Sequence, residues 1–199
     1  MKKRKFPLLL VLGIGLILIS LSLLLGFCIQ AHLGTQHSQK IVQQMNEILP
    51  ERTAGVPGMY PAANMPVLEM EGADYVAIVE IPAFGITLPV ADLWDSSQLY
   101  RSPARFYGSA YENTLIIGGA DDPGQFGFCD QIGHGAMIRV IDMTGTQFTY
   151  TVSKIERAKH AETQWLRSAN WDLTLFCHDT YSMEYIAVRC VLASNGSTN

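Results

Sequence analysis

The stretch that decides the fold is Trp171-Asp-Leu-Thr-Leu-Phe-Cys-His-Asp179, which is followed by Tyr185-Ile-Ala-Val-Arg-Cys-Val-Leu192. Both runs are apolar and rich in β-branched and aromatic residues, which is typical of buried strands. The short polar connection at residues 179–184 has the composition of a hairpin turn. The chain is therefore predicted to end in two adjacent antiparallel strands.

The rest of the second half of the chain shows the same pattern of short strands separated by turn residues. Few helices are expected there: one turn or two over 96–100 and over 163–169, with Trp165 and Trp171 at the second as packing anchors. Many short strands with few helices indicate a sandwich or a barrel, and the fold class is mainly β. The predicted strands are 75–81, 86–90, 114–117, 137–142, 147–155, 172–177 and 185–192.

The N-terminus has the features of a membrane anchor. A cluster of Lys and Arg at positions 2–5 precedes residues 6–29, a run of 24 uncharged residues rich in Leu and Ile. Such a run is long enough to cross a bilayer as a helix, and the basic cluster should stay on the cytoplasmic side. A cleaved signal peptide is the alternative, but the apolar run is longer than usual and no small-x-small cleavage site follows it.

This pattern predicts a single-pass membrane protein whose C-terminal domain is extracellular. Within the segment after the anchor, residues 36–49 place Ile41, Val42 and Met45 on one side of a helix, and Pro50 ends it. The expected divisions are a cytoplasmic basic tail 1–5, a transmembrane signal anchor 6–29, an amphipathic helix and linker arm 30–72, a β-barrel domain 73–193 and a polar tail 194–199.

Charge and cysteine content narrow the function classes. Beyond residue 5 the chain has 10 basic against 18 acidic residues, a formal charge of −8, which argues against nucleic acid as a partner. Three cysteines lie beyond the anchor, Cys129, Cys177 and Cys190. Because three is an odd number, at least one should be free unless it pairs with another chain. No Cys-x-x-Cys pair is present, so a structural zinc site is not expected.

The chain from about residue 75 to 193 resembles the sortases, the cysteine transpeptidases of Gram-positive cell envelopes. The resemblance rests on the order of several short segments, each of them weak alone. It implies a sortase-type β-barrel, and an activity that cleaves a sorting signal and transfers the acyl group to an amine. The segments are Tyr75-Val-Ala-Ile-Val-Glu-Ile-Pro82, Gly85-Ile-Thr-Leu-Pro-Val90, Asn113-Thr-Leu-Ile-Ile-Gly118, Gly145-Thr-Gln-Phe-Thr-Tyr-Thr-Val152 and the final strand pair.

The family's catalytic positions are altered in this sequence. The family strand Thr-Leu-x-Thr-Cys falls without gaps on residues 174–178, so His178 stands at the nucleophile position and Cys177 lies one residue early. The family histidine should follow Gly118, where this chain has Gly119. The family arginine falls on Tyr185, and Arg189, four residues further, shares its strand parity.

The resemblance implies a reaction that needs three groups. A thiolate attacks the peptide carbonyl, a histidine moves protons and an arginine stabilises the oxyanion. With all three positions changed, the leading hypothesis is a catalytically impaired or inactive protein that still binds sorting-signal-type peptides or assists an active sortase. The alternative is an active transpeptidase that uses Cys177 with Arg189. The two hypotheses differ in whether Cys177 faces the site or the core.

The sequence around His178 allows either a metal site or a surface turn. The pair His178-Asp179 has an imidazole beside a carboxylate, but neighbouring residues of an extended strand diverge. The ligand spacing matches no recognised metal pattern, so neither a metal nor a cofactor is predicted. A metal site at this pair would take further ligands from Asp121, Asp122 and His160.

Overall fold

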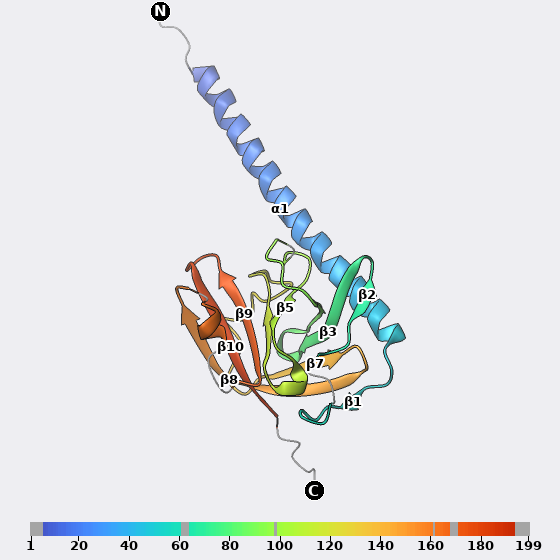
Figure 1. Cartoon of the computed structure of the whole chain (residues 1–199). Helices are drawn as coiled ribbons and strands as arrows, with labels where there is room; N and C mark the ends of the chain where they lie inside the picture. Colours follow the sequence, from blue (N-terminus) through green and yellow to red (C-terminus); the bar gives the residue numbers. More distant parts are fainter. Residues whose placement is uncertain (1–5, 61–63, 98, 161, 168–170, 194–199) are drawn as a thin grey trace, which may run out of the picture.

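The structure, a computed structural model, describes residues 6–60, 64–97, 99–160, 162–167 and 171–193 (Figure 1). It consists of one long helix and a β domain with very short helices. The helical elements are α1 Phe6–Ile48, η1 Pro82–Phe84, η2 Ala110–Glu112 and α2 Thr163–Leu166. The strands are β1 Thr53–Ala54, β2 Leu68–Met70, β3 Ala73–Ile81, β4 Ile86–Ala91, β5 Ala104–Tyr107, β6 Leu115–Gly118, β7 Met137–Asp142, β8 Thr146–Ala158, β9 Leu173–Asp179 and β10 Glu184–Leu192.

Eight of the strands close into a barrel. The hydrogen-bonded order is β8-β10-β9-β6-β5-β4-β3, and β7 closes the ring because it pairs with both β3 and β8. The short strands β1 and β2 pair with β8 and β3 outside this ring. The prediction of a mainly β barrel is thereby confirmed, including the final hairpin, in which β9 and β10 pair antiparallel.

The barrel interior is filled by alternate residues of each strand, because successive side chains of a strand point to opposite faces. On β9 the interior set is Leu173, Leu175 and Cys177, and all three are buried in the main core cluster. From β10 the same cluster receives Ile186 and Val188. The intervening residues of both strands therefore face outward, and this parity decides which side chains can form a site.

The helix α1 leaves the barrel and extends far beyond it (Figure 1). Its C-terminal part packs on the barrel through Ile41 and Met45, which are fully buried against β3 and β7 residues, and Ser38 Oγ donates to Arg101 O at 2.7 Å. Side chains of α1 are described for residues 10–24 and 36–48. Over the described residues, no helix is both long enough and apolar enough to span a membrane.

The segment predicted as a linker arm adopts more structure than its sequence pattern indicates. It contributes β1 and β2 at the two ends of the sheet order. Tyr60 stacks on Tyr111 with ring centroids 4.2 Å apart, and contacts Phe148 edge-on at 5.9 Å. These aromatic contacts fix part of the arm to the barrel, a tertiary effect that the Pro- and Gly-rich composition does not reveal.

Two further sequence expectations need correction. Residues 96, 97, 99 and 100 form turns instead of the expected helical turn, and the Asp95 carboxylate accepts from Ser97 N and Oγ, which favours a turn over a helix.

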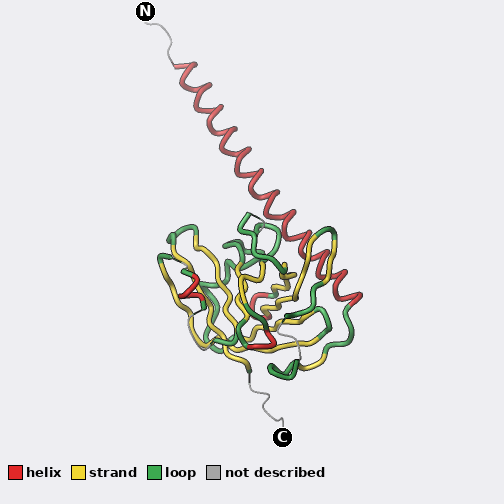
Figure 2. The backbone as a smooth tube through the Cα atoms, viewed as in Figure 1, coloured by secondary structure: helices red, strands yellow, loops and turns green. Residues whose placement is uncertain are grey.

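The strand β5 was not predicted. It lies next to β6 with an irregular register between Arg105 and Tyr107, so strict alternation is lost there. Loops gather on the side of the barrel from which α1 emerges (Figure 2).

Candidate functional site

The candidate site lies on the outer face of three adjacent strands, β6, β9 and β10. β6 runs parallel to β9, with Gly118 opposite Phe176, and β9 pairs antiparallel with β10. The center of this outer face is apolar and aromatic, in a cluster separate from the barrel core. Its members are Ile116, Phe176 and Ala187 from the strands, with Trp94, Phe106, Trp165, Leu166 and Tyr185 packed against them.

At one end of the outer face, His178 and Tyr185 lie side by side. The two residues are paired across β9 and β10, and their rings meet edge-on with centroids 4.7 Å apart. Both side chains are partly exposed. The residues at the family's nucleophile and arginine positions are therefore neighbours on the outer face, as the register of the final hairpin requires.

Cys177 points the opposite way, into the barrel. Its exposed fraction is 1%, and it belongs to the main core cluster. Its side chain contacts that of Cys129, whose pKa is raised well above the ordinary thiol value by burial first and by Cys177 next. Among the described residues of β6, β9 and β10, neither Cys177 nor Cys190 reaches the outer face, because both are core residues.

The backbone of Gly119 lies next to the His178 end of the outer face. Its N–H donates to Phe176 O at 3.0 Å, so it continues the pairing of β6 with β9. A Cβ at this position would lie 2.7 Å from the Phe126 ring, which is closer than packed carbon atoms approach. Because that ring is fully buried in the core, a side chain at position 119 would point toward the interior. An imidazole does not fit there in the present packing.

At the other end of the outer face, Arg189 is completely buried. Its Nε donates to Glu156 Oε2 at 3.0 Å, and its Nη1 donates to Thr174 Oγ1 at 3.1 Å. The remaining donations go to backbone carbonyls of α2: Nη1 to Leu166 O and Nη2 to Trp165 O, both at 2.8 Å. The guanidinium also lies 5.0 Å from the Trp165 ring centroid. Arg189 thus holds α2 over this end of the face, with its hydrogen-bonding groups already engaged.

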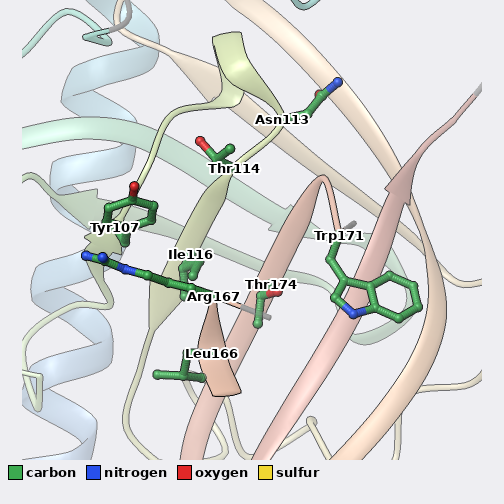
Figure 3. Close-up of a pocket in the computed structure, with 8 residues that line it drawn as sticks. All are labelled: Tyr107, Asn113, Thr114, Ile116, Leu166, Arg167, Trp171 and Thr174. Carbon is green, nitrogen blue, oxygen red and sulfur yellow. The ribbon is translucent and has the colours of Figure 1, made fainter. Parts of the chain in front are cut away.

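A small pocket is lined by Leu166 and Thr174 among others (Figure 3), and both of these residues accept hydrogen bonds from Arg189. Its volume is about 110 Å³. Arg167 extends from the end of α2 across Tyr107, with its guanidinium carbon 3.5 Å from the ring centroid. The full lining is Tyr107, Asn113, Thr114, Ile116, Leu166, Arg167, Trp171 and Thr174.

Sequence reasoning missed most of these pocket residues. Arg167 and Tyr107 are 60 positions apart, and only the packing of α2 on the barrel brings them together. Trp171, expected to be a packing anchor, also lines the pocket. The sequence did indicate Thr174, because this residue begins the strand motif of the sortase family.

The polar residues around the β9–β10 turn serve the turn itself. Asp179 accepts from the Ser182 hydroxyl at 2.6 Å and from the Tyr181 and Ser182 N–H groups, and these donors lower the pKa of Asp179 to about 2. Asp121 accepts from Thr180 N and Oγ1 at 3.1 Å. Within the described part of the chain, no three His, Cys, Asp or Glu side chains are placed to hold a metal ion.

Comparison with known proteins identifies the fold. No protein-family model matches the sequence, and no curated protein matches it. Solved structures do match, at low sequence identity. Sortase A from Corynebacterium diphtheriae is 17% identical with a TM-score of 0.55, and the match covers 85% of each chain.

Two sortases of another class show the same likeness. Sortase C from Clostridium perfringens SM101 is 17% identical, with a TM-score of 0.52 over 83% of this chain and 90% of that chain. Sortase C-1 from Actinomyces oris is 22% identical, with a TM-score of 0.51 over 59% of this chain and 73% of that chain. At these identities the likeness establishes a sortase fold for the barrel.

Proposed function

We propose that this protein is a sortase-fold module, anchored in the cell membrane with its barrel outside, that binds sorting-signal-type peptides or another envelope protein without catalysing transpeptidation. The observation that carries the proposal is the orientation of β9. Its outer face presents His178, while the thiol of Cys177 is buried in the barrel with 1% exposure. The protein would have kept the binding face and lost the nucleophile.

Two features of the structure count against an enzyme that uses Cys177 with Arg189. A thiol inside the core cannot meet a peptide carbonyl on the outer face unless β9 shifts its register by one residue, which would also turn Leu175 and Leu173 out of the core. Arg189 is buried, and its donors already bond Glu156, Thr174 and the α2 carbonyls. Freeing this guanidinium for an oxyanion would leave several buried acceptors unpaired, at a cost of about 1–3 kcal/mol each.

Peptide binding is supported by the chemistry of the outer face. The partly exposed rings of the cluster offer apolar contact area, and the neighbouring pocket adds the Arg167 guanidinium and the Thr174 hydroxyl. These rings are Trp94, Phe106, Trp165 and Tyr185. Aromatic side chains and arginine are enriched where proteins bind partners. An extended peptide with an apolar and a hydroxyl or carboxylate group would match this set.

Membrane anchoring is supported by the N-terminal half of α1. The side chains of Leu12, Ile17 and Leu23 are 64, 67 and 71% exposed, and eight further large apolar side chains between residues 10 and 24 are at least half exposed. Such a surface is stable in lipid and costly in water. The Lys and Arg residues before the helix would keep the N-terminus on the cytoplasmic side.

The decisive assay combines turnover and binding on the full chain in mild detergent. A panel of LPxTG-like peptides is offered with hydroxylamine as acceptor, to wild type and to Cys177→Ala. We expect no turnover above background from either protein. Turnover that disappears in Cys177→Ala would overturn the non-catalytic proposal and identify Cys177 as the nucleophile.

Binding is measured by fluorescence anisotropy of the same peptides carrying a label. Arg167→Ala should weaken binding several-fold, because it removes the guanidinium that lines the pocket. Arg101→Ala is the matched control, since Arg101 is also an exposed arginine set against a tyrosine ring, that of Tyr100. Equal effects of the two substitutions, or no binding by wild type, would refute a peptide site at this pocket.

A further inference from the structure

The turn between β9 and β10, residues 180–183, carries apolar side chains at its tip. Tyr181 is 98% exposed and Met183 is 66% exposed. Met183 also has a left-handed backbone, with φ 57°, which is uncommon for a residue with a long side chain. The two side chains together form a small apolar surface that protrudes from the barrel.

This turn is held in one conformation by two carboxylates. Asp179 accepts from the N–H groups of Tyr181 and Ser182 and from the Ser182 hydroxyl. From the other side, Asp121 accepts from the N–H and the hydroxyl of Thr180, both at 3.1 Å. These bonds use only backbone and hydroxyl groups, so the turn is fixed while its apolar side chains stay exposed.

The turn lies on the side of the barrel from which α1 emerges. Figures 1 and 2 show the connection between β9 and β10 on that side, together with other loops of the barrel. The emerging part of α1 bears the exposed apolar side chains between residues 10 and 24. A membrane that holds this part of α1 therefore faces the turn.

The docked end of α1 leaves little space between the barrel and that membrane. Ser38 is bonded to the β4–β5 connection through Arg101 O, and the uncharged run of the sequence ends at Ile29. Nine residues of helix separate Ile29 from Ser38, which is roughly 14 Å at the usual rise. The lipid headgroups occupy roughly 5–8 Å of this distance. Loops that extend beyond Ser38 toward the membrane therefore come close to the headgroups.

The chemistry of the turn fits a lipid surface without a net charge requirement. None of residues 180–183 is charged, and Arg157 beside the turn is paired with Asp179 at 3.5 Å. A tyrosine has an apolar ring and a polar hydroxyl, so it favours the boundary between lipid and water.

We propose that Tyr181 and Met183 insert into the interface of the membrane that holds α1, as a second contact between the protein and the bilayer. This inference rests on the membrane anchoring proposed above but not on peptide binding. Two points of attachment would fix the tilt of the barrel. They would also hold the His178 end of the outer face near the membrane surface, because the turn directly follows that end.

The test measures lipid contact at single positions of the full chain in phosphatidylcholine vesicles. A nitroxide label is attached to Met183→Cys in a Cys28→Ala background, in which the other three cysteines are buried. Its relaxation is measured with molecular oxygen, which concentrates in lipid, and with a nickel chelate, which stays in water. We expect a several-fold higher oxygen-to-nickel ratio at 183 than at a water-exposed position.

Met59→Cys is the matched control, since Met59 is also an exposed methionine, at 76%. It follows β1, which lies at the end of the barrel away from the N-terminus of α1 (Figure 1). Equal ratios at 183 and 59 would overturn the inference. A label at 183 that is shielded from both reagents would also overturn it, because a protein partner such as a second copy would then cover the turn.

A label at Ile17→Cys separates this inference from the anchor itself. Ile17 is 67% exposed on α1 and should show a high ratio in a membrane-spanning helix. A high ratio at 17 with a low ratio at 183 would leave the anchor in place and overturn the second contact. Low ratios at both positions would overturn both proposals.

A charge at the tip gives the last check. Tyr181→Asp should lower the ratio at 183 several-fold, because a carboxylate is costly to transfer out of water. Since the turn is uncharged, adding phosphatidylglycerol or salt should leave the wild-type ratio unchanged. A ratio that rises with anionic lipid and falls with salt would indicate electrostatic adhesion and contradict the apolar contact.

Discussion

The two ends of the outer face of β9 and β10 are built differently. At the His178 end, a His and a Tyr ring meet at 4.7 Å with part of each side chain open to solvent. At the Arg189 end, four residues along β10, the guanidinium is sealed under α2 and bonded to Glu156, Thr174 and two carbonyls. The outward-facing residues of β9 and β10 therefore have two different roles. Side chains at one end remain available to a partner, while those at the other hold the structure together.

Arg189→Met tests the structural end, where the largest effect is expected. Removing the guanidinium leaves Thr174 Oγ1 and the Trp165 and Leu166 carbonyls without this donor, whereas Glu156 keeps its bond to Lys154 at 2.8 Å. Each buried acceptor left unpaired costs about 1–3 kcal/mol. Urea denaturation of the barrel should show a loss of that order. Arg157→Met is the control, since Arg157 pairs with Asp179 at 3.5 Å at an exposed site and should change stability by less than about 1 kcal/mol. Similar losses in both variants would contradict the difference between the two ends.

Gly119→Ala tests the packing behind the His178 end. The new Cβ would lie 2.7 Å from the buried Phe126 ring, and overpacking of this kind costs about 1–3 kcal/mol. Gly133→Ala is matched to it, because a Cβ at Gly133 meets nothing within 4 Å, and it should be nearly neutral. The measurement is again urea denaturation. A neutral Gly119→Ala would show that Phe126 can move aside, and that a larger residue at 119 could be accommodated.

His178→Ala tests whether the His178 end of the outer face contributes to the stability of the fold. The ring contact with Tyr185 is worth about 0.5–1.5 kcal/mol beyond area burial, so the loss should stay well below that of Arg189→Met. The same variant should weaken peptide binding in the anisotropy assay if the peptide reaches this end. A large loss of stability would mean that both ends are structural.

Asp179→Asn gives the smallest expected effect, and it is seen through pH. The folded pKa of Asp179, about 2, lies below its ordinary value of 3.8. Its contribution is therefore fully present above about pH 4 and is lost as the pH falls toward 2. Wild type should lose slightly more stability than Asp179→Asn over this interval in acid denaturation curves. Parallel curves for the two proteins would contradict the turn contacts described for this carboxylate.

Strand periodicity predicted much of this arrangement. Alternation along residues 172–177 and 185–192, with gapless placement of one motif, indicated that His178 and Tyr185 share a face and that Cys177 lies on the other. These are local inferences, because parity and hairpin register depend on neighbouring residues alone. The same reasoning allowed Arg189 to be a site residue, since parity cannot show that a helix of four residues, α2, covers it.

The features that sequence did not predict all depend on contacts between distant segments. The pocket joins Tyr107 on β5 to Arg167 after α2, and Phe126 closes over Gly119 from the following loop. The contact of Cys129 with Cys177 spans 48 positions. Propensity and spacing carry no information about such pairs, which arise only when the barrel closes.

The docking of α1 on the barrel has a consequence for reach. A helix of 43 residues is a rod about 65 Å long, and its last turns are fixed to the barrel by Ile41, Met45 and the Ser38 bond to Arg101 O. A domain on a flexible tether samples a wide volume and can meet partners at many heights and angles. A domain carried on a docked rod keeps one distance and one orientation relative to the far end of that rod. With the N-terminal end held in a membrane, as proposed above, the barrel would stay at one height, and its partners would have to reach it there in a matching orientation.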